Sequence, residues 1–250
     1  MSSQVDRFRV ATYNIHRCRG WDQRVMPSRI ARVLEEIDAD IVALQEVVNH
    51  TVSPEQPGQA CYLAKKLGYE CRFGQTRQLR GKPYGNAVLS RFPIKTTKAY
   101  DLSCKRLEPR ACFQVDVELN EGQSVHIFNV HLGTTHSERQ RQALALVSKQ
   151  ILNSPALVHP RVMLGDFNDW MQGPVSRLLA SHLVSADLAA HLRRRRTYPG
   201  PLPIVHLDHI FFDASLYLES LKLHRSRTAL MASDHLPLIA DFRLSAGDKS

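Results

Sequence analysis

The 250-residue sequence has no long hydrophobic run. No stretch approaches the roughly 18 consecutive apolar residues that can cross a bilayer, and residues 1–10 lack the apolar segment of a signal peptide. The sequence also shows no repeat of fixed period, no low-complexity tail and no clear linker. These absences predict a monomeric cytoplasmic protein without a membrane segment, folded as one domain over residues 1–250 with its core at about 8–243.

Cysteine is sparse and follows no pattern. The five cysteines are an odd number and include no Cys-x-x-Cys pair, which argues against a disulfide framework or a zinc knuckle and indicates a reducing compartment. Hydrophobic residues make up 43% of the chain, enough for a sizeable core that needs neither disulfides nor a structural metal.

Charge is biased towards one sign. Lys and Arg number 33 against 24 Asp and Glu, which gives a formal net charge of +9. A basic balance favours polyanionic partners such as nucleic acid, an anionic membrane surface or a phosphorylated small molecule. The basic residues gather in three segments, at 72–82, 105–110 and 193–196.

Hydrophobic periodicity in the first half predicts alternating strands and helices. A helix opens at Pro27 with a buried stripe of Ile30, Val33, Leu34 and Ile37, and a second helix ends before Gly68. Strands are expected at 8–14, 41–45, 69–73, 86–90, 96–102 and 111–119, with a second helix at 59–67 and an exposed basic loop at 74–85.

The second half continues the mixed pattern. A hairpin turn at 120–123 leads into a strand at 125–132. Ser137 and Gln140 form a predicted capping box for a helix whose buried stripe is Leu144, Val147 and Ile151. A strand at 162–165, a short helix at 175–181, a basic proline-rich loop at 193–203 and strands at 207–212, 216–223 and 236–242 follow, which favours a single mixed α/β domain.

Polar residues follow several of these apolar strands. The strand at 162–165 is followed by Asp166 and Asn168, whose side chains would aim at one point on an extended chain, although a simple turn gives the same pattern. Because catalytic residues on α/β scaffolds gather in strand-end loops, recurrence of the pattern predicts one shared site. The other sets are Asn14 with His16, Glu46, His131, Asp208 with His209, and Asp234 with His235.

The residue types in these sets indicate metal-assisted chemistry. Carboxylates dominate, and hard oxygen ligands select Mg²⁺ or Mn²⁺, which lower the pKa of water and polarise a phosphoryl oxygen. A zinc site of His206, His209 and His235 with Asp208 is an alternative, although no His-Glu-x-x-His pattern supports it.

Seven short motifs in order resemble the endonuclease/exonuclease/phosphatase (DNase I-like) superfamily. The resemblance implies a four-layer α/β/β/α sandwich, in which two mixed β-sheets pack face to face with helices outside, and metal-dependent hydrolysis of a phosphate ester. The motifs are Tyr13-Asn14-Ile15-His16, Leu44-Gln45-Glu46, the segment 85–90, Val130-His131-Leu132, Gly165-Asp166-Phe167-Asn168, the segment 207–211 and the segment 233–237.

The resemblance also implies roles for individual residues. Asp166 would orient or deprotonate the attacking water, while Asn168 and the second histidine, His131, would contact the phosphate. Asp208 would hold His235 as a protonated imidazole, and Arg110 would bind phosphate unless it is a solvated loop charge. The metal ligands would be Glu46 and Asp234, with support from Asn14.

One motif departs from the pattern of the abasic-site endonucleases. Those enzymes carry Trp-Asn-x-Asn/Asp-Gly where this chain has Tyr13-Asn14-Ile15-His16 followed by Arg17. The resemblance is therefore closer to the DNase I, sphingomyelinase and phosphatase members of the superfamily. The motifs together with the net charge of +9 predict a metal-dependent phosphodiesterase of nucleic acid. Two alternatives are a phospholipid or small-molecule phosphoesterase, and a binding module that keeps the fold without catalysis.

Overall fold

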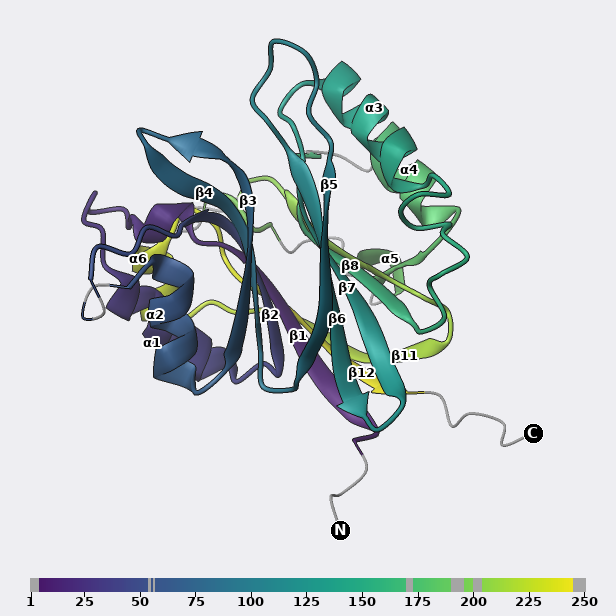
Figure 1. The fold of residues 1–250 in the computed structure, drawn as a ribbon, viewed down its shortest axis with the longest axis horizontal. Helices are drawn as coiled ribbons and strands as arrows, with labels where there is room; N and C mark the ends of the chain where they lie inside the picture. Colours follow the sequence, from purple (N-terminus) through teal and green to yellow (C-terminus); the bar gives the residue numbers. More distant parts are fainter. Residues whose placement is uncertain are drawn as a thin grey trace.

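The computed structural model describes residues 5–53, 55, 57–169, 173–189, 196–199 and 204–244. Within them, two six-stranded mixed sheets pack face to face, with helices against both outer faces (Figure 1). The four-layer sandwich predicted from the sequence is confirmed. None of the described helices is both long enough and apolar enough to cross a membrane.

The first sheet contains both ends of the described chain. Its strands, in spatial order, are β11 (Leu216–Leu223), β12 (Leu238–Leu244), β1 (Arg7–Asn14), β2 (Ile41–Val48), β4 (Lys82–Ser90) and β3 (Glu70–Leu79). Its outer face is covered by α1 (Pro27–Ile37), α2 (Gln59–Leu67) and α6 (Arg227–Ala232), and the short 3-10 turn η1 (His16–Cys18) follows β1.

The second sheet is built from the middle of the chain. Its strands, in spatial order, are β5 (Ile94–Asp101), β6 (Ala111–Asn120), β7 (Gln123–His131), β8 (Arg161–Asp166), β10 (Asp208–Phe212) and β9 (Val184–Ser185). The helices α3 (His136–Leu146), α4 (Pro174–Ala180) and α5 (Ala186–Ala189) lie on its outer side (Figure 1).

Three apolar layers hold the sandwich together. The central layer lies between the sheets and includes Val10, Val115, Ile127 and Phe242, all fully buried. A second layer packs α1, α2 and α6 on the first sheet, and a third packs α3 and α4 on the second. The predicted stripe of α1 belongs to the second layer and is buried.

Strand direction explains why polar strand ends from distant parts of the chain meet. The parallel pairs β1–β2 and β7–β8 lie inside their sheets, so all four carboxyl ends point to one edge of the sandwich. Strands β10 and β12 run antiparallel to β8 and β1, which brings their first residues to the same edge. Asp208 is the direct strand partner of Asp166.

Three local predictions are wrong. Residues 74–85 are not a loop, because β3 and β4 continue as an antiparallel hairpin that turns at Arg80-Gly81, where both residues have positive φ. The cap of α3 is Thr135, which accepts a hydrogen bond from Glu138 N, two residues before the predicted Ser137. Leu144 lies on the solvent side of α3 and is 62% exposed, and α3 ends at Leu146, so the buried Ile151 lies beyond the helix whose stripe it was predicted to join.

A buried polar cross-link joins the two sheets beneath the polar edge. Asn129 of β7 is fully buried, and its Nδ2 donates to the carbonyl oxygens of Leu44 at 3.0 Å and Ala87 at 2.9 Å. Its Oδ1 accepts from Gln45 Nε2 at 2.8 Å. One side chain from the second sheet thus satisfies three polar groups of the first.

We expect Asn129→Leu, a change of similar size, to lower the free energy of unfolding by about 3 kcal/mol, because it leaves buried polar groups without partners. Urea denaturation followed by circular dichroism measures the change. Asn153→Ala, which removes an exposed asparagine, is the matched control and should stay within roughly 1 kcal/mol of the wild type. Equal midpoints for Asn129→Leu and the wild type would contradict this role of the cross-link.

Candidate active site

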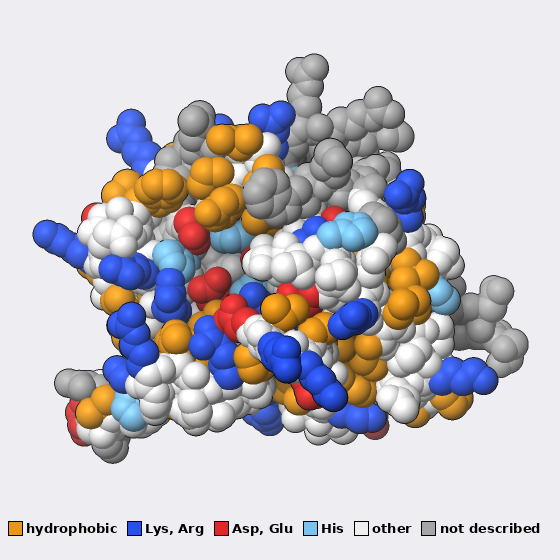
Figure 2. All heavy atoms as spheres, turned by 90° about the horizontal axis from the view of Figure 1, so that it is seen from above, with side chains coloured by type: hydrophobic (Ala, Val, Ile, Leu, Met, Phe, Trp, Pro, Cys, Tyr) orange, Lys and Arg blue, Asp and Glu red, His pale blue; other side chains and the backbone are white. Residues whose placement is uncertain are grey.

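The polar edge is hollow in its middle. Figure 2 looks onto it from above and shows acidic and histidine side chains gathered in a central depression, with Lys and Arg side chains around part of its rim. The strand ends described above supply the floor. Because the two sheets contribute side chains from opposite sides, the depression lies over their junction.

The deepest group consists of Asp166, Asp208 and His235, which present ligand atoms within 4.8 Å of one another. His235 Nδ1 donates to Asp208 Oδ2 at 2.9 Å, and its Nε2 lies 3.6 Å from Asp166 Oδ2. Asp208 is fully buried, and its Oδ1 has no hydrogen-bond partner among the described residues. The imidazole therefore lies between two buried carboxylates.

Burial alone would lower the pKa of His235, but the neighbouring carboxylates of Asp208 and Asp166 outweigh it and raise the pKa to about 10. His235 is therefore a cation at neutral pH. Burial raises the pKa of Asp166 to about 6, with His235 opposing the shift and Asp208 adding to it. A carboxylate with such a pKa can take up and release a proton close to neutral pH.

His131 approaches Asp166 from the other side. Its Nε2 lies 3.7 Å from Asp166 Oδ2 and accepts a hydrogen bond from Arg110 Nη1 at 2.9 Å. A guanidinium can only donate, so His131 carries its proton on Nδ1. Burial lowers the pKa of His131 well below its usual value, and the positive charge of Arg110 lowers it further, so this ring is neutral.

Arg110 is buried, with 6% of its surface exposed, so its interpretation as a solvated loop charge is wrong. Besides His131, it contacts Glu108 through Nη2 at 3.0 Å. Its Nε has no hydrogen-bond partner among the described residues. A buried guanidinium with an unused donor at the edge of an acidic depression is suited to bind an anion.

Asn14 links the two sheets within the site. Its Nδ2 donates to Asp166 Oδ2 at 2.9 Å and lies 3.4 Å from Glu46 Oε1, and its Oδ1 accepts from His16 N. The amide therefore orients two carboxylates that come from different sheets. Asn14 is buried to 99%, which keeps this arrangement out of water.

Glu46 does not end its strand, contrary to the sequence prediction. Strand β2 runs on to Val48, and its register with β4 shifts between Leu44 and Val47. Glu46 occupies this β-bulge with a positive φ of 57°. A bulge changes the direction of a side chain, so the carboxylate turns towards the depression and lies 3.7 Å from Arg17 Nε.

Asn168 does not extend the strand in parallel with Asp166. The backbone turns at Asn168, where φ is 50°, and Asn168 N donates to Asp166 Oδ1 at 2.9 Å. The Asn168 side chain donates to Leu132 O at 2.9 Å. The backbone therefore turns at Asn168, and the hydrogen bond of this turn fixes one carboxylate oxygen of Asp166.

Tyr198 packs beside His235, a contact that no pattern in the sequence indicates. Its ring centroid lies 5.0 Å from that of His235. Burial raises the pKa of Tyr198, and the charges of Asp234, Asp166 and Glu46 raise it further. The negative charges of these three carboxylates therefore act on the Tyr198 hydroxyl.

The depression suits a hard divalent cation. Glu46 and Asp234 make few contacts through their carboxylate oxygens, and the shortest are 3.4 Å from Asn14 Nδ2 to Glu46 Oε1 and 3.3 Å from Ser233 Oγ to Asp234 Oδ1. Carboxylate oxygens are the donors that Mg²⁺ and Mn²⁺ select. The predicted zinc set does not form one cluster among the described residues, because Asp208 and His235 belong to this group and His206 and His209 to another.

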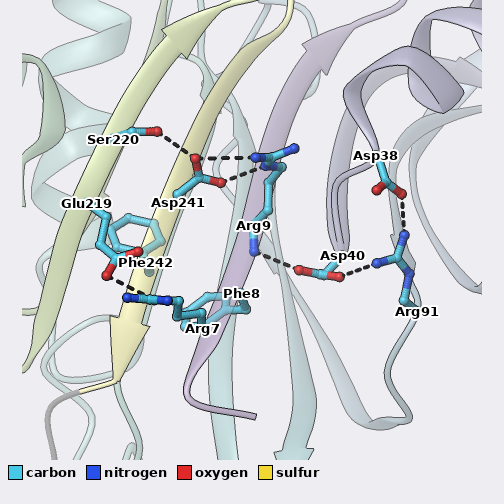
Figure 3. A pocket seen from close by; sticks show the side chains of 10 residues that line it. All are labelled: Arg7, Phe8, Arg9, Asp38, Asp40, Arg91, Glu219, Ser220, Asp241 and Phe242. Carbon is cyan, nitrogen blue, oxygen red and sulfur yellow. Dashed lines mark hydrogen bonds and ion pairs between the residues drawn. The ribbon is translucent and has the colours of Figure 1, made fainter.

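A second hollow, drawn in Figure 3, lies at the start of β1 and is not part of this site. Its charged groups pair with one another: Arg9 with Asp241 at 2.6 Å, and Arg91 with Asp38 and Asp40. Paired charges leave little capacity for a ligand. Most of the predicted basic, proline-rich loop, namely residues 193–195 and 200–203, lies outside the described residues.

Comparison with known proteins agrees with this geometry. Residues 11–235 match the model of the Endonuclease/Exonuclease/phosphatase family. An uncharacterized protein of Escherichia coli K12, YbhP, is 32% identical over 97% of this chain and 98% of its own length.

Solved structures share the fold. An endonuclease/exonuclease/phosphatase of Beutenbergia cavernae has a TM-score of 0.77 at 24% identity, over 96% of this chain and 72% of that one. The mannosyl-6-phosphatase Bt3783 of Bacteroides thetaiotaomicron has a TM-score of 0.74 at 21% identity, over 94% of this chain and 99% of that one. The chain belongs to the endonuclease/exonuclease/phosphatase family, whose members are hydrolases that act on phosphate esters.

Proposed function

We propose that this protein is a divalent-metal-dependent phosphodiesterase that hydrolyses nucleic acid by attack of water on phosphorus. The observation that carries the proposal is the buried group of Asp166, Asp208 and His235 beside the pair of Arg110 and His131. It combines a carboxylate that titrates near neutrality with two cationic groups. Water activation and stabilisation of phosphate charge need these two kinds of group.

Asp166 is the proposed base that orients and deprotonates the attacking water. Its Oδ1 is held by Asn168 N and its Oδ2 by Asn14, so the carboxylate is fixed before substrate binds. Asn168 uses one amide hydrogen for Leu132 O, which leaves its second amide hydrogen for a phosphate oxygen. The water and the phosphorus would therefore meet in a preorganised geometry.

His235 is the proposed electrostatic partner of the phosphate. Asp208 accepts the Nδ1 hydrogen, which fixes the ring and leaves the Nε2–H free to donate to a developing negative oxygen. His131 and Arg110 act from the opposite side, where Arg110 supplies the charge and His131 holds the guanidinium by accepting its Nη1 hydrogen at Nε2. The negative charge that develops on the phosphoryl oxygens would lie between them.

The proposed cofactor is Mg²⁺ or Mn²⁺, held by Glu46 and Asp234 with support from Asn14. Such an ion polarises a phosphoryl oxygen and lowers the pKa of a bound water. Asn14 contributes by holding Glu46 and Asp166 in fixed relation to each other.

The distribution of charge favours a polymeric anion over a small one. The β3–β4 hairpin carries exposed Arg72, Arg80 and Lys82, and the β5–β6 connection carries Lys105 and Arg106. Arg77 of the hairpin contacts Glu108 of the connection, which joins the two basic segments beside Arg110. Basic residues that extend beyond the catalytic group can contact several phosphates along a strand.

Nuclease assays test this proposal. Plasmid, single-stranded and double-stranded oligonucleotides of DNA and RNA are incubated with Mg²⁺ or Mn²⁺ across a salt series. We expect cleavage that weakens steeply as salt rises, because each neutralised phosphate releases counterions. The absence of cleavage on every nucleic acid, with turnover of a small phosphodiester such as bis-p-nitrophenyl phosphate, would refute the nucleic acid assignment and retain the catalytic one.

A phospholipid substrate is the second candidate, and an apolar patch favours it. Trp21, Met26 and Met231 are large, exposed side chains that lie together, since Trp21 N donates to Met231 O at 3.3 Å and Arg29 contacts both Met26 and Met231. The patch follows η1, which leads directly from Asn14. Headgroup release from anionic vesicles without nucleic acid cleavage would favour this candidate.

The pH dependence of kcat/KM should have an acid limb near pH 6. Asp166 must lose its proton to act as a base, and burial raises its pKa to about 6, so activity rises as pH passes through that value. His235 has a pKa raised to about 10, so its charge persists and activity stays level up to about pH 9. Initial rates between pH 5 and 9 at constant free Mn²⁺ measure the profile, and a rate that is constant down to pH 5 would exclude Asp166 as the base.

A further inference from the structure

A second group of potential metal ligands lies beside the active site and plays no part in the chemistry above. Asp187 of α5 and His206 and His209 around the start of β10 each present one ligand atom, and these atoms lie within 4.8 Å of one another. His206 and His209 flank the catalytic Asp208 in the chain. Two residues of the group therefore lie in the same chain segment as a residue of the active site.

The three side chains hold buried polar atoms without partners. Asp187 Oδ1, His206 Nε2 and His209 Nε2 have no hydrogen bond among the described residues. The side chains of Asp187 and His209 are only 8% and 6% exposed, so bulk water does not solvate them well. Buried polar groups normally find partners, so three unpartnered atoms in one group indicate a ligand that bonds to it.

The contact between His206 and Asp187 has the length of a shared ion and not that of a hydrogen bond. His206 Nε2 lies 3.7 Å from Asp187 Oδ1, which is too long for a hydrogen bond. Ligand bonds of about 2.0–2.1 Å in a tetrahedral zinc site give ligand-to-ligand separations of roughly 3.3 Å. His209 Nδ1 makes a hydrogen bond of 2.8 Å with Asp187 Oδ2, so the atoms left for an ion are Asp187 Oδ1 and the Nε2 atoms of His206 and His209.

We propose that Asp187, His206 and His209 form a binding site for a transition-metal ion of the Zn²⁺ type, separate from the catalytic Mg²⁺ or Mn²⁺. Two imidazole nitrogens and one carboxylate oxygen are ligands that Zn²⁺ accepts and that Mg²⁺ does not prefer. The His206 side chain is 22% exposed, so the group lies near the surface, and water would complete the coordination of the ion.

The ion would affect catalysis indirectly, by fixing the position of Asp208. Asp208 lies between two ligands, and it accepts the Nδ1 hydrogen of His235 at 2.9 Å. Metal binding would fix the start of β10 and its contact with α5. Asp187, His206 and His209 are thus positioning residues, whereas Asp208 and His235 belong to the catalytic group.

Zinc binding to the untagged full chain tests the proposal. The protein is stripped with a chelator, equilibrated with excess Mg²⁺, titrated with Zn²⁺ and passed through a desalting column before metal analysis. We expect one retained Zn²⁺ per chain and a rise of about 5 °C or more in the melting temperature at saturating zinc. His206→Ala should weaken zinc binding at least about tenfold and abolish the rise in melting temperature.

Three further variants separate this site from other zinc-binding positions. Asp187→Asn keeps the size of the side chain and should also lose zinc, while circular dichroism without metal shows whether it folds. His224→Ala removes a histidine that pairs with Glu36 elsewhere and should bind zinc like the wild type. The proposal is overturned if His206→Ala retains zinc with unchanged affinity, or if His235→Ala alone loses it.

Discussion

Asp166→Asn should lower kcat/KM on a cleavable phosphodiester by about 10³-fold, within the 10²–10⁴ typical of a lost general base. The asparagine keeps the size of the side chain and can still accept one of the two hydrogen bonds that Asn14 and Asn168 N donate. It cannot take a proton from water. The loss should therefore appear mainly in kcat, with substrate binding little changed.

Asp213→Asn is the matched control for this variant. Asp213 lies at the opposite end of β8 and β10, where it pairs with Arg161 at 2.5 Å. Removal of its charge should leave kcat/KM unchanged for the folded fraction of the protein. If Asp166→Asn retained wild-type turnover, or if both variants lost activity equally, Asp166 would have no direct part in the reaction.

Glu46→Gln should weaken the activating metal by about 10–100-fold or more, because a carboxylate that faces the ion contributes more than an outer partner. The variant keeps the bulge in β2 and the contact with Asn14, since glutamine has the same length. Activity should recover in part at high Mn²⁺ concentration. Initial rates across a metal titration give the apparent dissociation constant and separate this effect from a loss of kcat.

Glu36→Gln provides the control for charge and length. Glu36 lies on α1 and bonds to His224 and Thr228, away from the depression. The metal dependence of the Glu36→Gln variant should match that of the wild type. An unchanged metal requirement in Glu46→Gln would remove Glu46 from the proposed metal site, and the other carboxylate of the pair, Asp234, would then be the principal ligand.

The sequence predicts which residues meet because strand direction determines it. Apolar strands that end in polar residues are visible in the pattern, and parallel neighbours deliver their ends to one edge. Asn14, His131, Asp166 and Asp208 therefore lie where the pattern indicates. Recognition of the four layers depended on the motif resemblance, since periodicity alone indicated only a mixed α/β domain.

Details that depend on tertiary contacts could not be predicted from the pattern. The β-bulge at Glu46 leaves no signal in an apolar run, because an added residue changes register only against β4. The β3–β4 hairpin is polar and basic, and its residues are in strands because they pair with each other. Asp187 joins His209 from 22 residues away through the packing of α5 on β10, which no local spacing encodes.

The junction of the sheets also affects how the protein tolerates mutation. Both sheets contribute residues to the site, and the bonds of Asn14 to Asp166 and of Asn129 to Leu44 cross between them. Side chains of the central layer, such as Val115 and Ile127, therefore affect the distance between Asp166 and Glu46 in addition to the stability of the fold. Variants of the central layer should lose activity before they unfold. Equally destabilising variants in the layer beneath α1 should keep activity. The central layer should therefore tolerate fewer substitutions than the layer beneath α1.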